Sequence, residues 1–477
     1  MEKPLLSGIM DYINKVKLPL HMPGHKMGKG IRDKDFLRNI LKLDVTELDI
    51  TDNLYMPEGI IKEAQVLASK AFGSKKTFFI VNGATCAVQA MMLSVLNPGD
   101  SVLVARNSHV SVFSALVLGG FIPRYVSPRI SDEFGLSLGI HPSDIQKALT
   151  EDIKAYVHTY PNYYGFCDDI KRISEIVKGQ GIYLLVDEAH GSHFPFEERL
   201  PDSSLKHGAD MVVHSLHKTL PALTQCAVLH INSDRIDEDR VFKALSLIQT
   251  SSPSYFFMSS MDAARAYMEE EGRKALTSLL CGLEDIIEDL DGLNGIRVLG
   301  KTLKERHEIF DYDITKVLVN LRDLGISGVQ ADRILFNDYG IKVELSDGEN
   351  ILAIFTVADN REDMEYFKDS IKDLARRYVN SGKKGVFNPP YIPEEIPEMV
   401  LTPREAFFSE KKWVDFDGSA GKICGEFIKP YPPGVPLLVP GERITKELIG
   451  YIKNLLRMGI RIIGTKDSTL SRIQVIK

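Results

Sequence analysis

The sequence predicts an α/β fold (α/β class) built around a mostly parallel central β-sheet, with smaller units attached. Short apolar runs alternate with longer segments of helical periodicity from residue 77 to residue 231. The apolar runs contain few polar positions, which is typical of strands that helices cover on both faces. The chain has 477 residues, more than one hydrophobic core normally accommodates, so we expect two or three domains.

The elements of the central sheet follow one another along this region. Strands are expected at 77–81, 102–105, 122–126, 154–159, 182–186, 211–213 and 227–231, and helices at 87–96, 110–118 and 170–178. Asn97-Pro98-Gly99 ends the first helix and Gly119-Gly120 ends the second. Ligands of such sheets bind at the carboxyl ends of the strands, so residues that follow several of these strands should form one site.

The remaining pattern predicts four parts. Residues 1–70 should form an N-terminal arm with an active-site loop, 71–295 a large domain, 296–385 a small α+β domain and 386–477 a C-terminal domain. Two long amphipathic helices are expected at 259–271 and 275–290. The proline-rich segment Asn388–Pro397 reads as a semi-rigid linker.

Composition excludes several classes of partner. The balance of 58 basic and 65 acidic residues gives a net charge of -7, which argues against nucleic acid or an anionic membrane surface. Five cysteines lack the spacing of a metal site or a disulfide framework, so we expect reduced thiols in a cytoplasmic protein. The first twenty residues are interrupted by Asp11, Lys15 and Lys17, so we expect no export signal and no membrane span.

Asp187 and Lys218 carry the strongest chemical signal. Asp187 ends one apolar strand, and Lys218 follows the next strand within Ser215-Leu-His-Lys218. This is the pattern of a pyridoxal-phosphate site, in which a lysine forms an imine with the cofactor aldehyde. A buried carboxylate keeps the ring nitrogen protonated, so that the ring accepts electrons. Most lysines are solvated surface groups, but this position at a strand end favours function.

Asn82-Gly83-Ala84-Thr85 predicts a phosphate-binding turn. It lies between a strand and a helix, where free backbone N–H groups and the helix dipole attract an anion. The alternative is an ordinary helix cap made by Asn82 or Thr85.

Two further motifs contain histidine. His109 follows a strand and is a candidate to stack on the cofactor ring, although such a histidine is more often structural. In His21-Met-Pro-Gly-His-Lys26 the proline and glycine break any helix between the two histidines, so we predict no metal site. This segment is either a glycine-containing loop near the active site or a simple exposed loop.

A cationic substrate requires an acid to bind its distal group. Glu442 follows the turn Val439-Pro-Gly441, and Asp49 lies in an acidic cluster with Glu47 and Asp52. These two acids, together with His25, are the candidate substrate contacts, although loop acids are usually only solvated.

Taken together, the motifs resemble the Orn/Lys/Arg decarboxylase family in its short form. The resemblance is carried by His21–Lys26, Glu47-Leu-Asp49, Asp52-Asn-Leu54, Asn82–Thr85, Asp187-Glu-Ala-His-Gly191, Ser215–Lys218, Leu401-Thr-Pro-Arg-Glu-Ala-Phe407 and Pro430-Tyr-Pro-Pro-Gly434. It implies an aspartate-aminotransferase-like fold of type I, pyridoxal 5'-phosphate as cofactor, and a homodimer or a multiple of dimers. Pro221 and Cys226 depart from the family pattern after the lysine.

The resemblance also implies roles for individual residues. The expected catalytic set is Lys218, Asp187, His109 and His217, and the expected cofactor contacts are Gly83, Ala84, Thr85, His109, Asp187, Ala189, His190, Ser215, His217 and Lys218. Thr85, Ser215 and His217 would hold the phosphate. Ala189 would pack on the ring face opposite His109, and His190 would form the wall beside the cofactor.

The implied reaction is decarboxylation of a basic amino acid, with arginine, which yields agmatine for polyamine biosynthesis, as the first choice. Lysine and ornithine are alternatives. An aminotransferase of the same fold would need an arginine that grips the substrate α-carboxylate, and Arg404 leaves that point open. A non-catalytic binding homologue is the remaining alternative.

Overall fold

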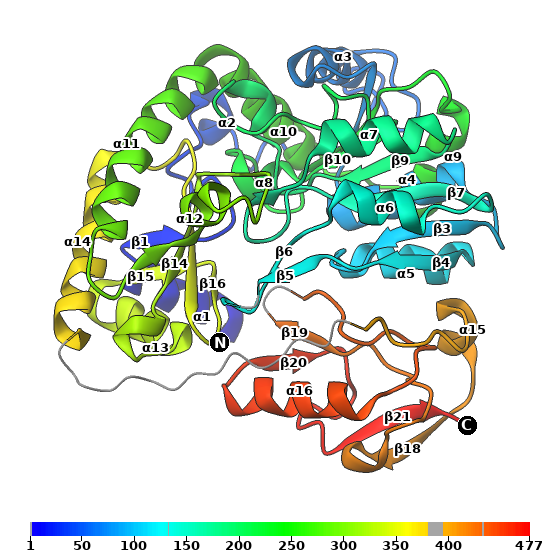
Figure 1. The fold of residues 1–477 in the computed structure, drawn as a ribbon. Helices are drawn as coiled ribbons and strands as arrows, with labels where there is room; N and C mark the ends of the chain where they lie inside the picture. Colours follow the sequence, from blue (N-terminus) through cyan, green and yellow to red (C-terminus); the bar gives the residue numbers. More distant parts are fainter. Residues whose placement is uncertain (1, 132, 380–394, 432–433) are drawn as a thin grey trace.

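A computed structural model describes residues 2–131, 133–379, 395–431 and 434–477. A seven-stranded sheet forms its centre (Figure 1). In spatial order its strands are β2 (Lys76–Ile80), β11 (Ala227–Ile231), β10 (Met211–His214), β9 (Tyr183–Asp187), β7 (Ile153–Thr159), β3 (Ser101–Ala105) and β4 (Ile122–Val126). All neighbours from β10 to β4 pair in parallel. The predicted α/β fold with a mostly parallel sheet is therefore confirmed.

β11 runs antiparallel to both of its neighbours, β10 and β2. The chain between β10 and β11 contains only the single-turn helix α8 (Leu216–Thr219). A parallel pairing requires a crossover that carries the chain back along the sheet, and one helical turn is too short for that. The short connection therefore explains the single reversed strand.

Helices cover both faces of the sheet. One face packs against α4 (Gly83–Val95), α5 (Val110–Gly119) and α9 (Glu238–Ile248). The other face packs against α7 (Ile170–Gly179), α10 (Tyr255–Tyr267) and α11 (Arg273–Asp291). Consecutive residues of β9 point to opposite faces of the sheet. Leu184 packs on the side of α7, α10 and α11, and Leu185 packs on the side of α4, α5 and α9.

Three predicted helices differ from the structure by more than one residue at an end. The helix expected at 87–96 already begins at Gly83, whose φ of 78° is a left-handed value that favours glycine. The helices expected at 259–271 and 275–290 are instead one continuous rod, in which the π-helical turn Met268–Gly272 joins α10 to α11. Low helix propensity of glycine and threonine explains the late expected start of the first helix.

A second, four-stranded antiparallel sheet follows in the chain. Its strands are β12 (Arg297–Val298), β14 (Lys316–Asn320), β17 (Asn350–Ile354) and β16 (Leu345–Ser346), and α12 (Leu299–Glu305), α13 (Gly328–Ile334) and α14 (Arg361–Tyr378) accompany it. α14 packs along α11 and so joins this sheet to the main body (Figure 1). Asn360 and Asp363 form a capping box at the start of α14.

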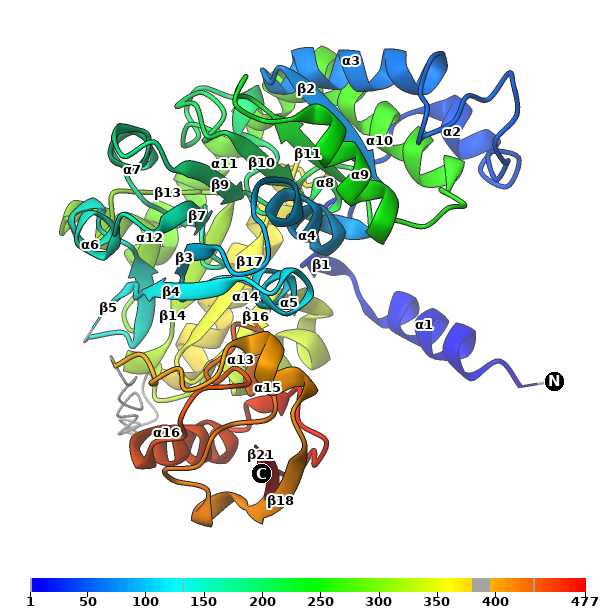
Figure 2. The ribbon, with the colours of Figure 1, turned by 90° about the vertical axis from the view of Figure 1, so that its right-hand side faces the viewer.

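The N-terminal arm is attached beside this second sheet through a separate two-stranded pair. Its strand β1 (Leu18–Leu20) pairs in parallel with β15 (Ile341–Val343). The arm also contains α1 (Pro4–Lys15), α2 (Lys34–Arg38) and α3 (Ile60–Phe72). α1 buries none of its residues, and Figure 2 shows it extending away from the rest of the chain.

The C-terminal segment has its own small core, which includes Ile428, Ile452 and Ile473. It contains α15 (Pro403–Phe408), α16 (Lys446–Arg457) and the strand pairs β18 (Lys411–Asp415) with β21 (Arg472–Ile476) and β19 (Lys429–Tyr431) with β20 (Arg461–Ile463). Most of the predicted linker, residues 388–394, lies outside the described residues. No helix among the described residues has both the length and the apolar character needed to span a bilayer.

Short elements complete the fold. They are β5 (Arg129–Ser131), β6 (Leu136–Gly139), β8 (Phe166–Cys167), β13 (Asp311–Tyr312) and α6 (Pro142–Ala148). β5 pairs with β6 and β8 pairs with β13, and both pairs are antiparallel.

A buried ion pair joins the C-terminal segment to the main sheet. Arg106, which follows β3, lies 3.2 Å from the Glu442 carboxylate and also donates to the Pro436 and Leu437 carbonyls. The Glu442 side chain is fully buried and accepts a further hydrogen bond of 2.8 Å from the Val439 backbone N–H. Burial raises the pKa of Glu442, and the Arg106 charge opposes that shift.

Replacing Glu442 with alanine should destabilise the protein strongly, because it leaves the Arg106 charge buried without its partner. Breaking such a pair costs about 3–5 kcal/mol. Glu398→Ala is the matched control, since Glu398 pairs with Arg443 on the exposed surface, where an ion pair contributes less than about 1 kcal/mol. Thermal unfolding measures both variants. Equal shifts of the unfolding midpoint would contradict a stabilising role for the buried pair.

Candidate active site

The carboxyl edge of the main sheet brings the predicted chemical residues together. Asp187 is the last residue of β9, and Lys218 lies in α8 directly after β10 (Figure 1). Gly83 opens α4 after β2, and His109 precedes α5 after β3. Segments distant in sequence thus converge where parallel sheets bind their ligands.

Lys218 makes one side-chain contact within this cluster. Its Nζ lies 3.0 Å from Nε2 of His190. Burial lowers the pKa of Lys218, while the charges of Asp187 and Glu344 oppose that shift. A lowered pKa increases the fraction of neutral amine, which is the nucleophilic form.

The buried Asp187 carboxylate accepts only one hydrogen bond from the described residues. The residue is 5% exposed, and its Oδ1 accepts a hydrogen bond of 3.2 Å from the Ala189 N–H. Among the residues that the structure describes, no second donor reaches this carboxylate. Burial raises the pKa of Asp187, and the positive charge of Lys218 opposes this. One carboxylate oxygen is therefore left for a donor that the chain does not supply, as a protonated ring nitrogen would be.

The first turn of α4 is suited to an anion. The Asn82 side chain does not cap this helix and instead accepts a hydrogen bond from the Thr250 N–H. Thr85 is exposed in the first turn, so neither side chain makes the ordinary cap that was the alternative interpretation. The leading N–H groups of a helix have no partner within it, and a Cβ added at Gly83 would meet Gln225 only at an ordinary contact distance of 3.9 Å.

Ser215 and His217 lie at the start of α8. The Ser215 hydroxyl is 3.2 Å from Nδ1 of His217, which lies at the same distance from the Cys226 carbonyl. Burial, with the Lys218 charge as a second cause, lowers the pKa of His217 to about 4. The ring is therefore neutral at neutral pH.

His109 has a structural contact as well as a place in the site. Its Nδ1 accepts a hydrogen bond of 3.2 Å from the Ser111 N–H and so caps α5. The residue is exposed to solvent at its surface, and desolvation by the protein around the ring lowers the pKa of His109 to about 4, with the Lys218 charge as the second cause. The capping contact is the structural role that the sequence analysis gave as the alternative to ring stacking. The ring is neutral beside Lys218 at neutral pH.

Three residues near Lys218 were absent from the expected site. Tyr163 packs edge-on against His190 with 5.1 Å between ring centroids, and its hydroxyl donates to Glu344. Lys316 donates to the Tyr163 carbonyl at 3.0 Å, and burial lowers the pKa of Lys316 to about 8. Tyr163 follows β7 at the same sheet edge, so the strand-end rule could have found it. Lys316 lies in β14 of the second sheet, Glu344 lies directly before β16, and no motif marks either residue.

The loop around Gly24 packs against α8. The Gly24 N–H donates to the His217 carbonyl at 2.7 Å, and a Cβ on Gly24 would lie 2.8 Å from the Leu220 carbonyl oxygen. Only glycine fits this approach. His25 accepts a hydrogen bond from the Gly28 N–H and lies close enough for its charge to affect the pKa of His217. The loop therefore lies beside the site, which agrees with the interpretation of a glycine-containing loop near the active site and not with that of a simple exposed loop.

The structure does not support the expected substrate acids. Glu442 is fully buried, and Arg106 and the Val439 N–H already occupy its carboxylate. This contradicts the expectation that it meets a substrate, because the acid is committed to holding the C-terminal segment. Asp49 is exposed in the segment before α3. Arg404 donates to the Val117 and Leu118 carbonyls at the end of α5, so its role is structural.

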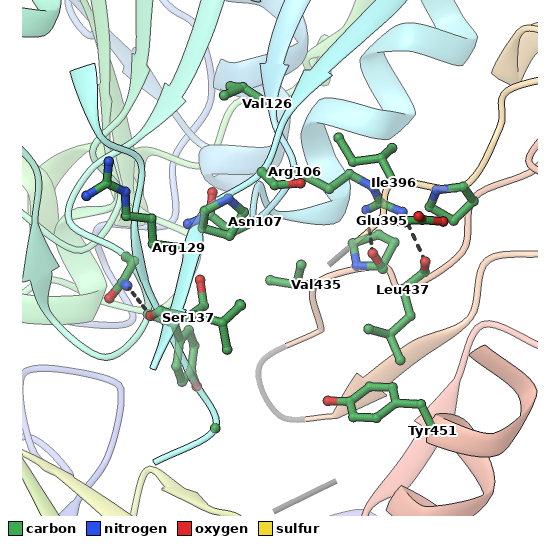
Figure 3. A pocket seen from close by; sticks show the side chains of 18 of the residues that line it. Arg106, Asn107, Val126, Arg129, Ser137, Glu395, Ile396, Val435, Leu437 and Tyr451 are labelled. Carbon is green, nitrogen blue, oxygen red and sulfur yellow. Dashed lines mark hydrogen bonds between the residues drawn. The ribbon is translucent and has the colours of Figure 1, made fainter. Parts of the chain in front are cut away.

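A cavity of about 760 Å³ lies beside this edge, between the loops after β3 and β7 and the C-terminal segment (Figure 3). Asn107, Ser137 and Leu437 are among its lining residues, and Figure 3 shows Arg106 bonded to Leu437 at its wall. Tyr163 also lines the cavity, so this space and the Lys218 cluster share one wall.

Comparison with known proteins agrees with this arrangement. A profile of the major domain of Orn/Lys/Arg decarboxylases matches residues 3–363, and a profile of their C-terminal domain matches residues 390–466. An arginine decarboxylase of Bacillus anthracis is 37% identical over 482 aligned residues, which cover 100% of this chain and 97% of that protein. An arginine decarboxylase of Bacillus subtilis (strain 168) is 36% identical, with 100% and 98% covered.

Solved structures show the same fold at lower identity. The lysine decarboxylase LdcF of Francisella novicida superimposes with a TM-score of 0.78 at 20% identity, covering 99% of this chain and 83% of that one. The family profiles and the full-length relatives agree over the segments that carry Asp187 and Lys218. The chain belongs to the Orn/Lys/Arg decarboxylase family.

Proposed function

We propose that this decarboxylase uses pyridoxal 5'-phosphate to convert L-arginine to agmatine and CO₂, as a lyase of cytoplasmic polyamine biosynthesis. The observation that carries the choice of substrate is the identity of 36–37% with arginine decarboxylases over the whole chain. A lysine decarboxylase of Pseudomonas aeruginosa is only 23% identical over 94% of the chain. Lysine and ornithine remain the alternative substrates.

The proposed cofactor contacts follow from the geometry of the sheet edge. Lys218 would hold the aldehyde carbon and Asp187 the ring nitrogen. Gly83, Ala84, Thr85, Ser215 and His217 would hold the phosphate, while His109, Ala189 and His190 would surround the ring. When bound, the cofactor supplies an electron sink for the pair of electrons that CO₂ leaves behind.

The chain's own residues control charge and protons. The buried Asp187 carboxylate retains a proton on the ring nitrogen, because one of its oxygens has no donor among the described residues. Lys218 carries the proton that the α carbon needs after CO₂ departs. His109 and His217, each with a pKa lowered to about 4, add no positive charge at neutral pH.

The position of Arg404 favours decarboxylation over transamination. An aminotransferase needs a cation that grips the substrate α-carboxylate, and such a grip would oppose its loss. Arg404 is bound to the end of α5 by two carbonyls. It therefore provides no such clamp.

We further propose that the chain acts as a homodimer, with the four domains expected from the sequence. The N-terminal arm supports this assembly, because several of its large apolar side chains are exposed in the part of the chain that the structure describes. Leu5 is 77% exposed and Ile50 is 83% exposed, and large apolar side chains gathered on one arm are typical of an interface.

Lys218→Ala tests the central assignment. Purified protein supplied with pyridoxal phosphate should lose its visible absorption band, and CO₂ release from arginine should disappear, because the proposed attachment point is gone. Absorption spectra and radiolabelled CO₂ release measure the two effects. Retained turnover would refute the role of Lys218.

Asp187→Asn tests the electron sink. We expect the variant to keep bound cofactor but to lose activity by about 100-fold or more, the scale seen when a preorganised electrostatic partner is removed. Absorbance titration and steady-state kinetics separate binding from catalysis. Near-normal turnover would rule out the proposed ring-nitrogen role.

Competition between arginine, lysine and ornithine tests the substrate. Arginine should have the highest kcat/KM and should suppress CO₂ release from the other two when all are present. The amines agmatine, cadaverine and putrescine are distinguished by mass spectrometry. A preference for lysine or ornithine would overturn the arginine assignment while leaving the decarboxylase class intact.

A further inference from the structure

His190 is a buried imidazole with a single polar partner. The residue is 7% exposed, and its Nε2 lies 3.0 Å from Nζ of Lys218. Its other ring nitrogen, Nδ1, is buried and has no hydrogen-bond partner among the described residues. A buried polar atom without a partner costs free energy, so its retention requires an explanation beyond packing.

Two buried histidines satisfy both ring nitrogens, whereas His158 and His193 each have one ring nitrogen without a hydrogen-bond partner among the described residues and face the carboxylates of Asp168 and Asp313. His214 lies between Glu188 at 2.9 Å and His230 at 3.0 Å, and His230 continues to Thr77 at 2.8 Å. That chain anchors Glu188, which immediately follows Asp187. His190, in the same loop, is connected instead to Lys218 alone, which points to a role in the chemistry of Lys218.

The position of the His190 ring is supported by its neighbours. Tyr163 packs edge-on against the ring, and the Tyr163 hydroxyl donates to Glu344. Glu344 also accepts a hydrogen bond of 2.9 Å from the Met22 N–H. Tyr163, Glu344 and the Met22 backbone, which come from three different segments, therefore hold the His190 ring on one side of Lys218.

The imidazole is neutral in this environment. Burial lowers the pKa of His190 well below its usual value, and the charges of Lys218 and Lys316 add to that shift. A neutral ring whose Nε2 carries no proton accepts an N–H bond from the Lys218 ammonium. It thereby restricts the rotation of Nζ.

We propose that His190 is a positioning residue for proton delivery by Lys218. This inference rests on the proposed decarboxylation. When the bond between the α carbon and the carboxylate breaks, CO₂ leaves and the electron pair stays with the substrate. That pair takes a proton from Lys218 Nζ: the N–H bond breaks, the C–H bond forms, and the amine becomes neutral. His190 holds another N–H of Nζ, so the proton reaches one face of the α carbon.

Decarboxylation in D₂O gives the first test. Wild-type protein should place deuterium at the α carbon of the product amine in a single configuration, which NMR of a chiral derivative detects. His190→Leu should give a mixture of configurations and a lower kcat with little change in KM. His190→Gln should restore much of the selectivity, because its amide oxygen can accept the same hydrogen bond. A single configuration from His190→Leu would overturn the proposal.

The apoenzyme gives a second test that needs neither cofactor nor turnover. An amine-reactive reagent labels only the neutral form of Lys218, and peptide mass spectrometry follows this labelling across pH. The charges of Asp187 and Glu344 act on the pKa of this amine, and the Lys218 charge acts in turn on the pKa values of His190, Lys316, His109 and His217. Removal of the His190 acceptor in His190→Leu destabilises the ammonium, so labelling at neutral pH should rise several-fold. Unchanged labelling would contradict the inferred contact.

His193→Gln is the matched control. His193 lies in the same loop and is also buried, but its Nε2 faces Asp313 and Thr315 instead of Lys218. The variant should lower thermal stability and leave both the deuterium configuration and the labelling of Lys218 unchanged. Scrambled configuration in this control would attribute the effect to general loop damage and would overturn the proposal. Absence of CO₂ release from wild-type protein would instead refute the proposed function, while labelling would still test the contact.

Discussion

Burial of two opposite charges at one edge of a parallel sheet is the constraint on which the rest of this structure depends. Asp187 is buried and Lys218 is partly buried, and each moves the pKa of the other toward its charged form while burial moves it away. Removing either partner would leave an uncompensated charge in the site. The parallel pairing of β9 with β10 keeps the two groups together, because it ends both strands at the same edge.

The surroundings of this pair come from every part of the chain. The N-terminal loop approaches α8 so closely that only glycine fits at position 24. The second sheet contributes Glu344 and Lys316, and the loop after β7 contributes Tyr163. The C-terminal segment makes no direct contact with Lys218 that the structure records, yet the buried pair of Arg106 and Glu442 attaches it to the loop that leads to His109. Each part therefore supports one edge of one sheet.

The local sequence pattern predicted most strands of the central sheet. The expected strand at 227–231 agrees with β11, the one at 211–213 ends one residue before β10 does, and the one at 182–186 is shifted by one residue from β9. Continuous apolar runs between turns define buried strands well. The reversed direction of β11 was not predicted, since it depends on the length of a connection. The start of α4 at Gly83 was missed because propensity places glycine outside helices, whereas its left-handed φ is what the turn requires.

By itself, the sequence determined the fold class, the sheet edge at which the candidate residues meet, and the choice of Asp187 and Lys218 as candidates. These features follow from local periodicity and from residues that come directly after strands, so no long-range contact is needed to recognise them. Only the tertiary structure decided that Glu442 holds the C-terminal segment, that Arg404 caps α5, and that His190 contacts Lys218 beside Tyr163 and Glu344. Those contacts join residues far apart in the chain, and burial and packing, which no short motif encodes, select their partners.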